Sequence, residues 1–275
     1  MPRARAAPYG PGVSRMTIDP ADAVCDDTAA DALRRAYVLF ATRIPGGSVS
    51  RDASGAESVV IPVPKARMNG LLLPRGDVDR ALLRRLAEPF AGEPWSVSVI
   101  DAEPPGVAVL AAELGLTRTA LPSLTTPVRP TPPGAPGPDA TEIRTVSTDR
   151  ERQLWATTCD LAYGSPAGLT ARLLTPELAA APEVRAHLAL LDGRPVATAL
   201  TVLDDRGWLG LFTVGTVPEA RRKGIGERLV RFALEDGARR GARTAYLQSS
   251  AMARALYERI GFQDDGHPIV SFETV

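Results

Sequence analysis

Residues 209–241 read LGLFTVGTVPEARRKGIGERLVRFALEDGARRG. The apolar stretch 209–214 has the length of a strand, a turn with proline follows, and a long helical pattern covers 224–241. The segment therefore predicts a strand, a turn and an amphipathic helix in that order. The helix residues expected to face inward are Ile225, Leu229, Phe232 and Ala233.

The turn before this helix concentrates positive charge and glycine. Arg221, Arg222 and Lys223 come directly before Gly224 and Gly226. Glycine lets the backbone approach a bulky anion, and the helix N-terminus adds a partial positive charge. We therefore expect a pyrophosphate to bind here. The pattern is neither the Gly-x-x-x-x-Gly-Lys-Ser/Thr of a P-loop nor the early Gly-x-Gly-x-x-Gly of a dinucleotide fold.

The next segment, AYLQSSAMARALYERIGF over 245–262, predicts a strand and a capped helix. Ser249 or Ser250 can cap the helix, and Gly261 suits its left-handed end. Tyr257 falls at the margin of the apolar face and by itself is typical of a half-buried packing residue. The residues expected to pack inward are Met252, Leu256 and Ile260.

Upstream, the pattern from residue 141 predicts a sheet with two helices. A strand is expected at 142–146, and helices at 149–163 and 169–180. Two strands, 184–191 and 195–203, form a predicted hairpin around Asp192-Gly193, a favoured two-residue turn.

Taken together, these segments resemble the GNAT superfamily of N-acetyltransferases. The matching features, in order, are the strand ending at Phe212-Thr213-Val214, the Val217-Pro218-Glu219 turn, Arg221-x-x-Gly224-x-Gly226 and the LYERIGF run over 256–262. The resemblance extends over 141–275, including the DGRPVA hairpin. It implies an α/β fold with a twisted mixed sheet flanked by helices.

The resemblance also implies an activity, the transfer of an acetyl group from acetyl-CoA to the amine of a small molecule in a ternary complex. Tyr257 matches the family's proton donor to the departing thiolate. No metal is implied. Backbone groups of three residues match those that pair with the pantetheine arm and polarise the thioester, and the following loop matches the pyrophosphate site. The implied cofactor residues are Val214, Gly215, Thr216, Arg221, Arg222, Lys223, Gly224, Ile225, Gly226, Glu227 and Ser250.

Two departures from the family pattern leave the general base open. The strand 208–214 contains no acidic residue, and Gln248 stands where a Glu is frequent. Ser250 likewise replaces a frequent Asn. Without an evident carboxylate base, we expect weakly basic amines as acceptors. Candidate bases elsewhere are Asp160, His187, Asp204 and Glu219.

The N-terminal half carries a second α/β pattern before a Pro-rich stretch, PVRPTPPGAPGP over 127–138. Its alternating strands and helices by themselves favour a mainly parallel sheet. It resembles a degenerate GNAT unit without the Arg-x-x-Gly-x-Gly loop, so the chain resembles tandem GNAT proteins with one silent half. The expected domains are a disordered tail over 1–20, the degenerate unit over 21–126, a linker over 127–140 and the catalytic unit over 141–275.

Composition limits the other classes of function. The 32 basic and 32 acidic residues cancel, which argues against a nucleic-acid binder. Cys25 and Cys159 with two histidines are too few for a His/Cys metal centre. No apolar run approaches the 18 residues of a membrane span, and no secretory signal is evident. We therefore expect a cytoplasmic protein, with a homodimer as an option. Two alternatives stay open: a CoA-binding regulatory protein without catalysis, and an acyltransferase with another acyl donor or an oxygen acceptor.

Overall fold

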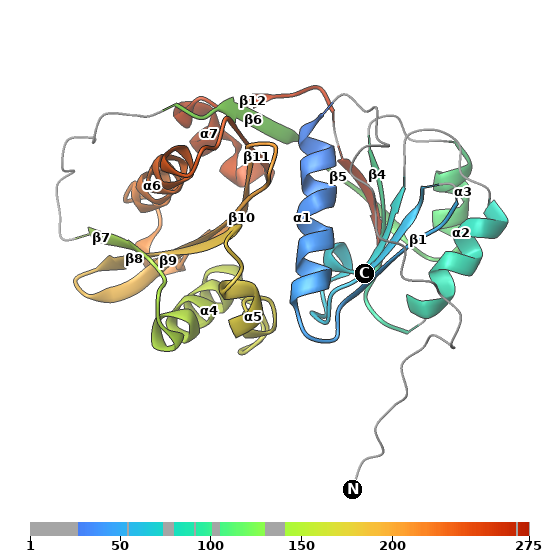
Figure 1. Cartoon of the computed structure of the whole chain (residues 1–275), viewed down its shortest axis with the longest axis horizontal. Coiled ribbons are helices and arrows are strands. Elements are labelled where there is room, and N and C mark those ends of the chain that lie inside the picture. The colour runs from blue at the N-terminus through green and yellow to red at the C-terminus, as the bar shows by residue number, and fades with distance from the viewer. Residues whose placement is uncertain are drawn as a thin grey trace, which may run out of the picture.

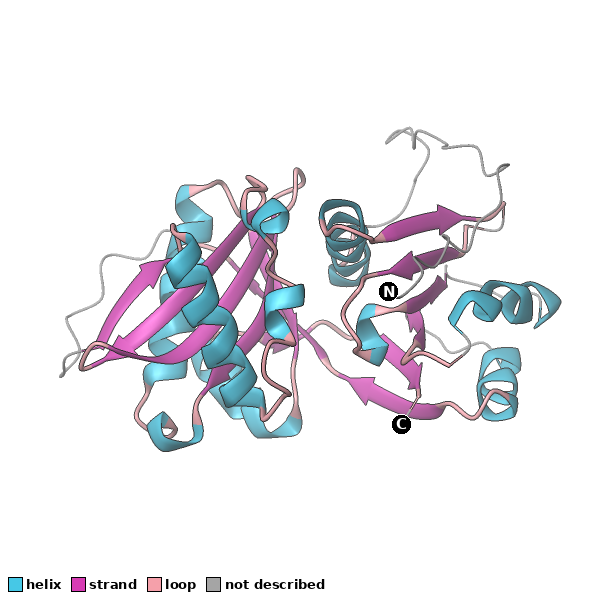
Figure 2. Cartoon of the chain, turned by 90° about the horizontal axis from the view of Figure 1, so that it is seen from below, coloured by secondary structure: helices cyan, strands magenta, loops and turns pink. Residues whose placement is uncertain are grey.

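The computed structural model describes residues 27–53, 55–73, 80–90, 92–100, 105–129, 141–267 and 269–274. The expected tail and most of the Pro-rich linker lie outside these ranges, as does Asp77, which the sequence pattern makes a candidate N-cap for a helix that ends near residue 90. Within them the chain forms two α/β units that lie next to each other (Figure 2). None of the described helices is long and apolar enough to cross a membrane.

The N-terminal unit begins with α1, which lies between the two sheets (Figure 1). The side chain of Thr28 caps α1, and the carboxylate of Asp31 closes a capping box on it. The elements of this part of the chain are α1 (Ala29–Arg43), β1 (Ser48–Arg51), β2 (Glu57–Val60), β3 (Gly70–Leu73), α2 (Arg80–Ala87), β4 (Ser96–Ile100), α3 (Pro105–Glu113) and β5 (Thr117–Leu121).

The C-terminal unit contains the longer strands and helices. Its hairpin turn has Asp192 at φ 51° and Gly193 at φ 73°, the left-handed pair that a two-residue turn favours, so the predicted hairpin is confirmed. The remaining elements are β6 (Ser123–Pro127), β7 (Thr141–Thr145), α4 (Asp149–Tyr163), α5 (Pro176–Ala179), β8 (Val184–Leu191), β9 (Arg194–Leu203), β10 (Trp208–Thr216), α6 (Ile225–Arg239), β11 (Thr244–Gln248), α7 (Ala251–Ile260), β12 (Gln263–Asp264) and β13 (Ile269–Glu273).

The two sheets share one topology. The first has the order β1-β2-β3-β4-β13-β5, and the second reads β7-β8-β9-β10-β11-β6-β12. Each contains a single parallel pair among its described strands, β3–β4 in one and β10–β11 in the other. Both sheets are therefore mixed, and the mainly parallel sheet expected for the first unit is wrong. Its first three strands pair antiparallel, because they follow one another without a crossover helix.

The units exchange one strand each, which the sequence boundaries did not anticipate. Strand β6 lies in the second sheet between β11 and β12, while β13 lies in the first sheet between β4 and β5. The single strand expected over 118–128 is two strands, and Pro122 stands between them at the point where the chain changes sheets. The expected boundaries at 126 and 275 thus assign both strands to the wrong unit.

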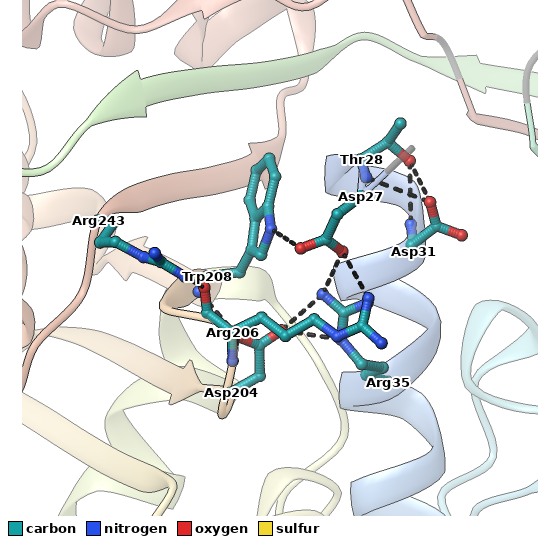
Figure 3. Close-up of polar contacts among 8 residues, drawn as sticks. All are labelled: Asp27, Thr28, Asp31, Arg35, Asp204, Arg206, Trp208 and Arg243. Carbon is teal, nitrogen blue, oxygen red and sulfur yellow. Dashed lines mark hydrogen bonds and ion pairs between the residues drawn. The ribbon is translucent and has the colours of Figure 1, made fainter. Parts of the chain in front are cut away.

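Helix α1 ties the units together through a shared core. Phe40 packs edge-on against Phe212 of β10, with ring centroids 5.3 Å apart. The N-terminal residues of α1 pack against Tyr246 of β11. At the same helix, Arg35 donates to Asp204 and pairs with Asp27, while the Trp208 indole donates to Asp27 (Figure 3). The first helix of the chain is therefore part of the surroundings of the second sheet.

Other local expectations need correction. The helix expected over 169–180 is a 3-10 turn, Thr170–Arg172, followed by the short α5, because Thr175 and Pro176 start a new helix. Met252 does not pack inward: 84% of it is exposed. On α6, Arg239 pairs with Asp236, three residues before it, and not with Glu235, which has the i,i+4 spacing of a typical helix ion pair.

Candidate active site

The second sheet opens between its two parallel strands. β10 and β11 pair only from Trp208↔Thr244 to Gly210↔Tyr246, although β10 continues to Thr216. On its other side, β11 pairs with β6 along its whole length, from Thr244 to Gln248. Strands β10 and β11 therefore diverge and leave backbone groups of β10 without a strand on that side.

A bulge in β10 shapes this opening. The pairing of β10 with β9 shifts between Phe212 and Gly215, and Thr213 adopts φ 49°. A non-glycine residue in this left-handed region is uncommon and marks a locally strained turn of the strand. The Thr213 hydroxyl is buried without a hydrogen-bond partner. The bulge leaves Thr213 and Val214 outside the regular ladder with β9.

The C-terminal turn of α4 packs directly on the bulge. A Cβ at Gly215 would lie 2.9 Å from Cβ of Ala162 and 2.9 Å from the ring of Tyr163, so only glycine fits. The Tyr163 hydroxyl donates to the carbonyl oxygen of Val214 at 2.9 Å. Two of the three predicted backbone residues, Val214 and Gly215, are thus in contact with a side chain that the sequence did not single out.

The predicted anion loop follows β10 and leads into α6. Gly224 is the N-cap of α6 at φ 75°, and Arg222 also adopts a left-handed φ of 64°. Arg222 and Lys223 are exposed, and neither forms an ion pair with a described residue. The first amides of α6, at Ile225, Gly226 and Glu227, precede the first intrahelical bond from Arg228 to Gly224. The loop presents free cations and amides together.

The guanidinium of Arg221, a residue that the resemblance implies for cofactor binding, donates to two backbone carbonyl groups. Its Nε donates to the carbonyl of Thr216 at 3.0 Å, and its Nη2 donates to the carbonyl of Ala162 at 2.8 Å. The guanidinium thus fastens the loop to the ends of β10 and α4. Glu227 is held by Arg231, at 3.0 Å, and by Arg259, and these contacts, the first above all, lower its pKa.

Tyr257 lies behind the opening on α7. Only 6% of it is exposed, and it packs with Leu211 of β10, Leu247 of β11 and, edge-on, Phe262. Burial raises the pKa of Tyr257 to about 12, so the phenol stays protonated at neutral pH. Ser250 is the N-cap of α7 but makes no capping bond with its side chain.

Two of the candidate general bases, Asp160 and Asp204, are held by hydrogen bonds. The Asp160 carboxylate accepts from the amides of Gly168 and Thr170 and is buried, so it fixes the loop after α4. Asp204 accepts from the amides of Arg206 and Trp208 and from Arg35 (Figure 3).

The other two candidate bases, His187 and Glu219, differ in their exposure to solvent. His187 is fully buried on β8, where burial lowers its pKa to about 4. Glu219 is exposed in the 3-10 turn after β10. The described residues contain no cluster of acidic, His and Cys side chains that could hold a metal ion.

The structure adds two residues to the site. Tyr163 reaches Val214, and the Lys65 ammonium lies 5.6 Å from the centroid of the Tyr163 ring. Tyr163 is half exposed, and desolvation of its hydroxyl is the main cause that raises its pKa. Lys65 belongs to the N-terminal unit, so no local pattern in the sequence could have placed it here. Tyr163 offered one signal, its place at the last turn of a helix that ends at Gly164.

Comparisons with known proteins agree with this architecture. The sequence model of the Acetyltransferase (GNAT) family matches residues 152–262. No curated protein matches the chain in a sequence search.

Among solved structures, a GCN5-related N-acetyltransferase from Kribbella flavida has a TM-score of 0.69 at 19% identity, over 91% of this chain and 97% of that one. One from Sphaerobacter thermophilus has a TM-score of 0.59 at 20% identity, over 90% and 86%. A tandem GNAT protein from the clavulanic acid biosynthesis pathway has a TM-score of 0.58 at 17% identity, over 86% of each chain.

The family match begins in α4 and ends just after α7, so it contains the opening, the loop and Tyr257. The whole-chain similarity to a tandem GNAT protein covers both units. Residues 152–262 of the C-terminal unit therefore match the GNAT acetyltransferase family, and the chain as a whole shares the fold of the solved GNAT proteins.

Proposed function

We propose that the C-terminal unit transfers an acetyl group from acetyl-CoA to the amine of a small molecule, by direct attack in a ternary complex. The observation that carries this proposal is the joint arrangement at the opening between β10 and β11. Free amides and cations lie where β10 ends, and a protonated, buried Tyr257 lies against one face. One opening thus offers the means to hold a thioester and to protonate its leaving group.

The loop after β10 suits the pyrophosphate of the donor. Arg222 and Lys223 supply charge, and the amides of Ile225, Gly226 and Glu227 supply hydrogen bonds at the positive end of α6. A Cβ at Gly226 would lie 3.4 Å from the side chains of both Thr216 and Leu256, so the start of α6 lies close to the end of β10 and to α7. In this proposal Val214, Gly215 and Thr216 take the pantetheine arm, and Ser250, the N-cap of α7, contributes to the same donor site.

The reaction needs no covalent intermediate on the protein. The neutral amine attacks the thioester carbon, the C–N bond forms, and the C–S bond breaks with its electron pair on sulfur. Tyr257 gives its proton to that thiolate, and the proton lost from the nitrogen returns through water to Tyr257. Backbone N–H groups near the bulge stabilise the oxyanion, each contributing about 3 kcal/mol in comparable sites.

The pKa values set a limit on this proton transfer. Against a reference thiol near 8.5, a phenol with a pKa of about 12 gives its proton uphill by about 5 kcal/mol. The pKa of a thiol in the same apolar surroundings is raised as well, which reduces the difference between the pKa values of Tyr257 and the thiol. Tyr257 therefore transfers its proton to the sulfur late in the reaction, when negative charge has developed on the sulfur.

The N-terminal unit has the supporting role in this proposal. It repeats the strand order of the second sheet, yet the residues between β3 and α2 read PRGDVD, with one glycine and two acids. That sequence offers no counterpart to the cationic glycine loop before α6. We therefore assign the single donor site of the chain to the C-terminal unit.

The test is a CoA-release assay over a panel of amines, with mass spectrometry of each product. The proposal expects an N-acetylated product that accumulates in step with free CoA. Tight CoA binding with no product from any amine would instead favour a regulatory CoA-binding protein. Faster turnover with a longer acyl-CoA, or an O-acetylated product, would overturn the choice of donor or of acceptor.

A further inference from the structure

A cavity of about 120 Å³ lies between the two units, next to the opening of the second sheet. One wall is α1, one is the N-terminal sheet with its exchanged strand β13, and the third is the end of β11. Figure 1 shows α1 between the two sheets at this place. Its apolar lining is provided by Ala30, Leu33, Leu72, Leu121 and Ile269.

The cavity lies on the face of the sheet opposite Tyr257. Side chains alternate along a strand, so Tyr246 and Gln248 share one face of β11, and Leu247 points to the other. Tyr246 packs with α1, whereas Leu247 packs with Tyr257. Gln248, which lines the cavity, stands beyond the last residue pair between β10 and β11. Here no paired strand separates the cavity from the face that carries Tyr257.

Gln248 brings an unsatisfied donor to this cavity. Its side-chain nitrogen is buried and has no hydrogen-bond partner. A buried donor left unpaired is unfavourable, and a ligand oxygen that accepts its hydrogen bond would remove that cost. The cavity is therefore prepared for a group that accepts a hydrogen bond at this point.

The remaining polar lining consists of donors and hydroxyls. Arg34 and Arg67 are held by Glu57, at 2.7 Å, and by Glu273, at 2.6 Å, and each guanidinium has five N–H donors, more than these pairs use. Tyr37 adds a hydroxyl. None of the described lining residues carries a carboxylate, and the carboxylates of Glu57 and Glu273 next to the cavity are paired with the two guanidinium groups.

We propose that this cavity holds the acceptor, a small amine that also carries a carboxylate and an apolar body, as an amino acid does. The carboxylate accepts from Gln248 and the guanidinium groups, the apolar body lies against Leu33 and Leu121, and the amine points toward the opening. This inference rests on the proposed acetyl transfer and adds its substrate class.

Matched acceptors test the carboxylate. L-leucine is compared with isopentylamine, which lacks the carboxylate, and kcat/KM is calculated for each on the concentration of its neutral form, because the two amines differ in pKa. We expect at least a tenfold preference for L-leucine, the equivalent of one hydrogen bond to a charged group.

Matched variants test Gln248. Gln248→Met keeps the size but removes the donor, and Gln248→Glu puts a negative charge in its place. Both are expected to raise the KM for L-leucine about tenfold or more, to leave isopentylamine unaffected, and to leave acetyl-CoA affinity as in the wild type. Gln263→Met on β12, where the glutamine is exposed, is the control.

Equal kcat/KM for the two amines, or Gln248 variants that behave like Gln263→Met, would overturn the inference and leave the proposed function standing. If no amine is acetylated, calorimetry of L-leucine against the acetyl-CoA-saturated chain decides. Binding that is lost in Gln248→Met supports the cavity although the proposed function fails, and the absence of binding overturns both.

Discussion

At the scale of single residues, removal of the Tyr257 hydroxyl tests its catalytic role without a change in the packing of the ring. Tyr257→Phe keeps the ring in its contacts with Leu211, Leu247 and Phe262 and removes only the hydroxyl, for which no hydrogen bond is found among the described residues. We expect kcat to fall about 100-fold or more, the usual contribution of a general acid, with acetyl-CoA affinity and Tm unchanged. Two-substrate kinetics and thermal unfolding measure these effects.

The pH dependence of kcat provides a second test of the role of Tyr257. Because burial raises the pKa of Tyr257 to about 12, its acid form is fully present from neutral pH to about pH 11. The kcat of the wild type should therefore lose nothing to this residue between pH 7 and 10. An unchanged kcat in Tyr257→Phe, with Tyr246→Phe as the comparison, would remove the assignment.

His187 predicts a pH dependence of stability instead of activity. Its ring lies 3.3 Å from the hydroxyls of Thr145 and Thr201, and burial lowers its pKa to about 4 from an ordinary value near 6.5. Between these values the unfolded chain binds a proton that the folded chain does not, so stability falls as pH falls from 6.5 toward 4.

Over that window the contribution amounts to about 3 kcal/mol. Urea unfolding at pH 7 and pH 4 should show a smaller difference in His187→Asn than in the wild type. The exposed His267 serves as the control, since His267→Asn should keep the full difference. Equal differences in all three proteins would contradict the assignment to His187.

At the scale of elements, the loop between β10 and α6 should bind the donor through charge. Arg222→Glu with Lys223→Glu reverses two exposed charges, so the fold should persist while the Kd for acetyl-CoA rises at least tenfold. Arg84→Glu with Arg85→Glu on α2, the equivalent helix of the first unit, is the matched control. Equal affinities in the two double variants, measured by calorimetry, would exclude the loop as the pyrophosphate site.

Elements with local signals could be predicted from the sequence. The α4 helix has Thr148 and Glu151 as a capping box, and the β8–β9 hairpin has Asp192-Gly193 at its turn. The loop and α7 were recognisable because their glycines and caps lie within a few residues of each other. The break of the helix expected after residue 169 was missed, although Thr175-Pro176 is a start signal.

At the scale of the whole molecule, the partner of a strand is set by long-range contacts. The sequence pattern over 118–128 predicts one strand. Alternation with a period of two predicts that a strand forms, but it does not indicate which sheet the strand joins. The same holds for β13, which pairs with β4 and β5 more than a hundred residues upstream. For the same reason, Lys65 and the cavity beside Gln248 could not be predicted from either half.

The strand exchange makes a prediction of its own. A chain ending at His267 lacks β13, so β4 and β5 lose the strand between them, while every strand of the second sheet remains. Hydrogen exchange by mass spectrometry should then show lost protection in β4 and β5 and retained protection in β9 and β10. A loss centred on β11 and β12 would contradict the exchange.

The central claim is that one unit holds the donor and the other supports it. Titration of acetyl-CoA into the full chain by calorimetry tests this claim most directly, because the loop before α6 has no counterpart in the PRGDVD sequence before α2. The account predicts one acetyl-CoA per chain. A stoichiometry of two acetyl-CoA per chain would contradict it, because the N-terminal unit would then hold a donor site as well.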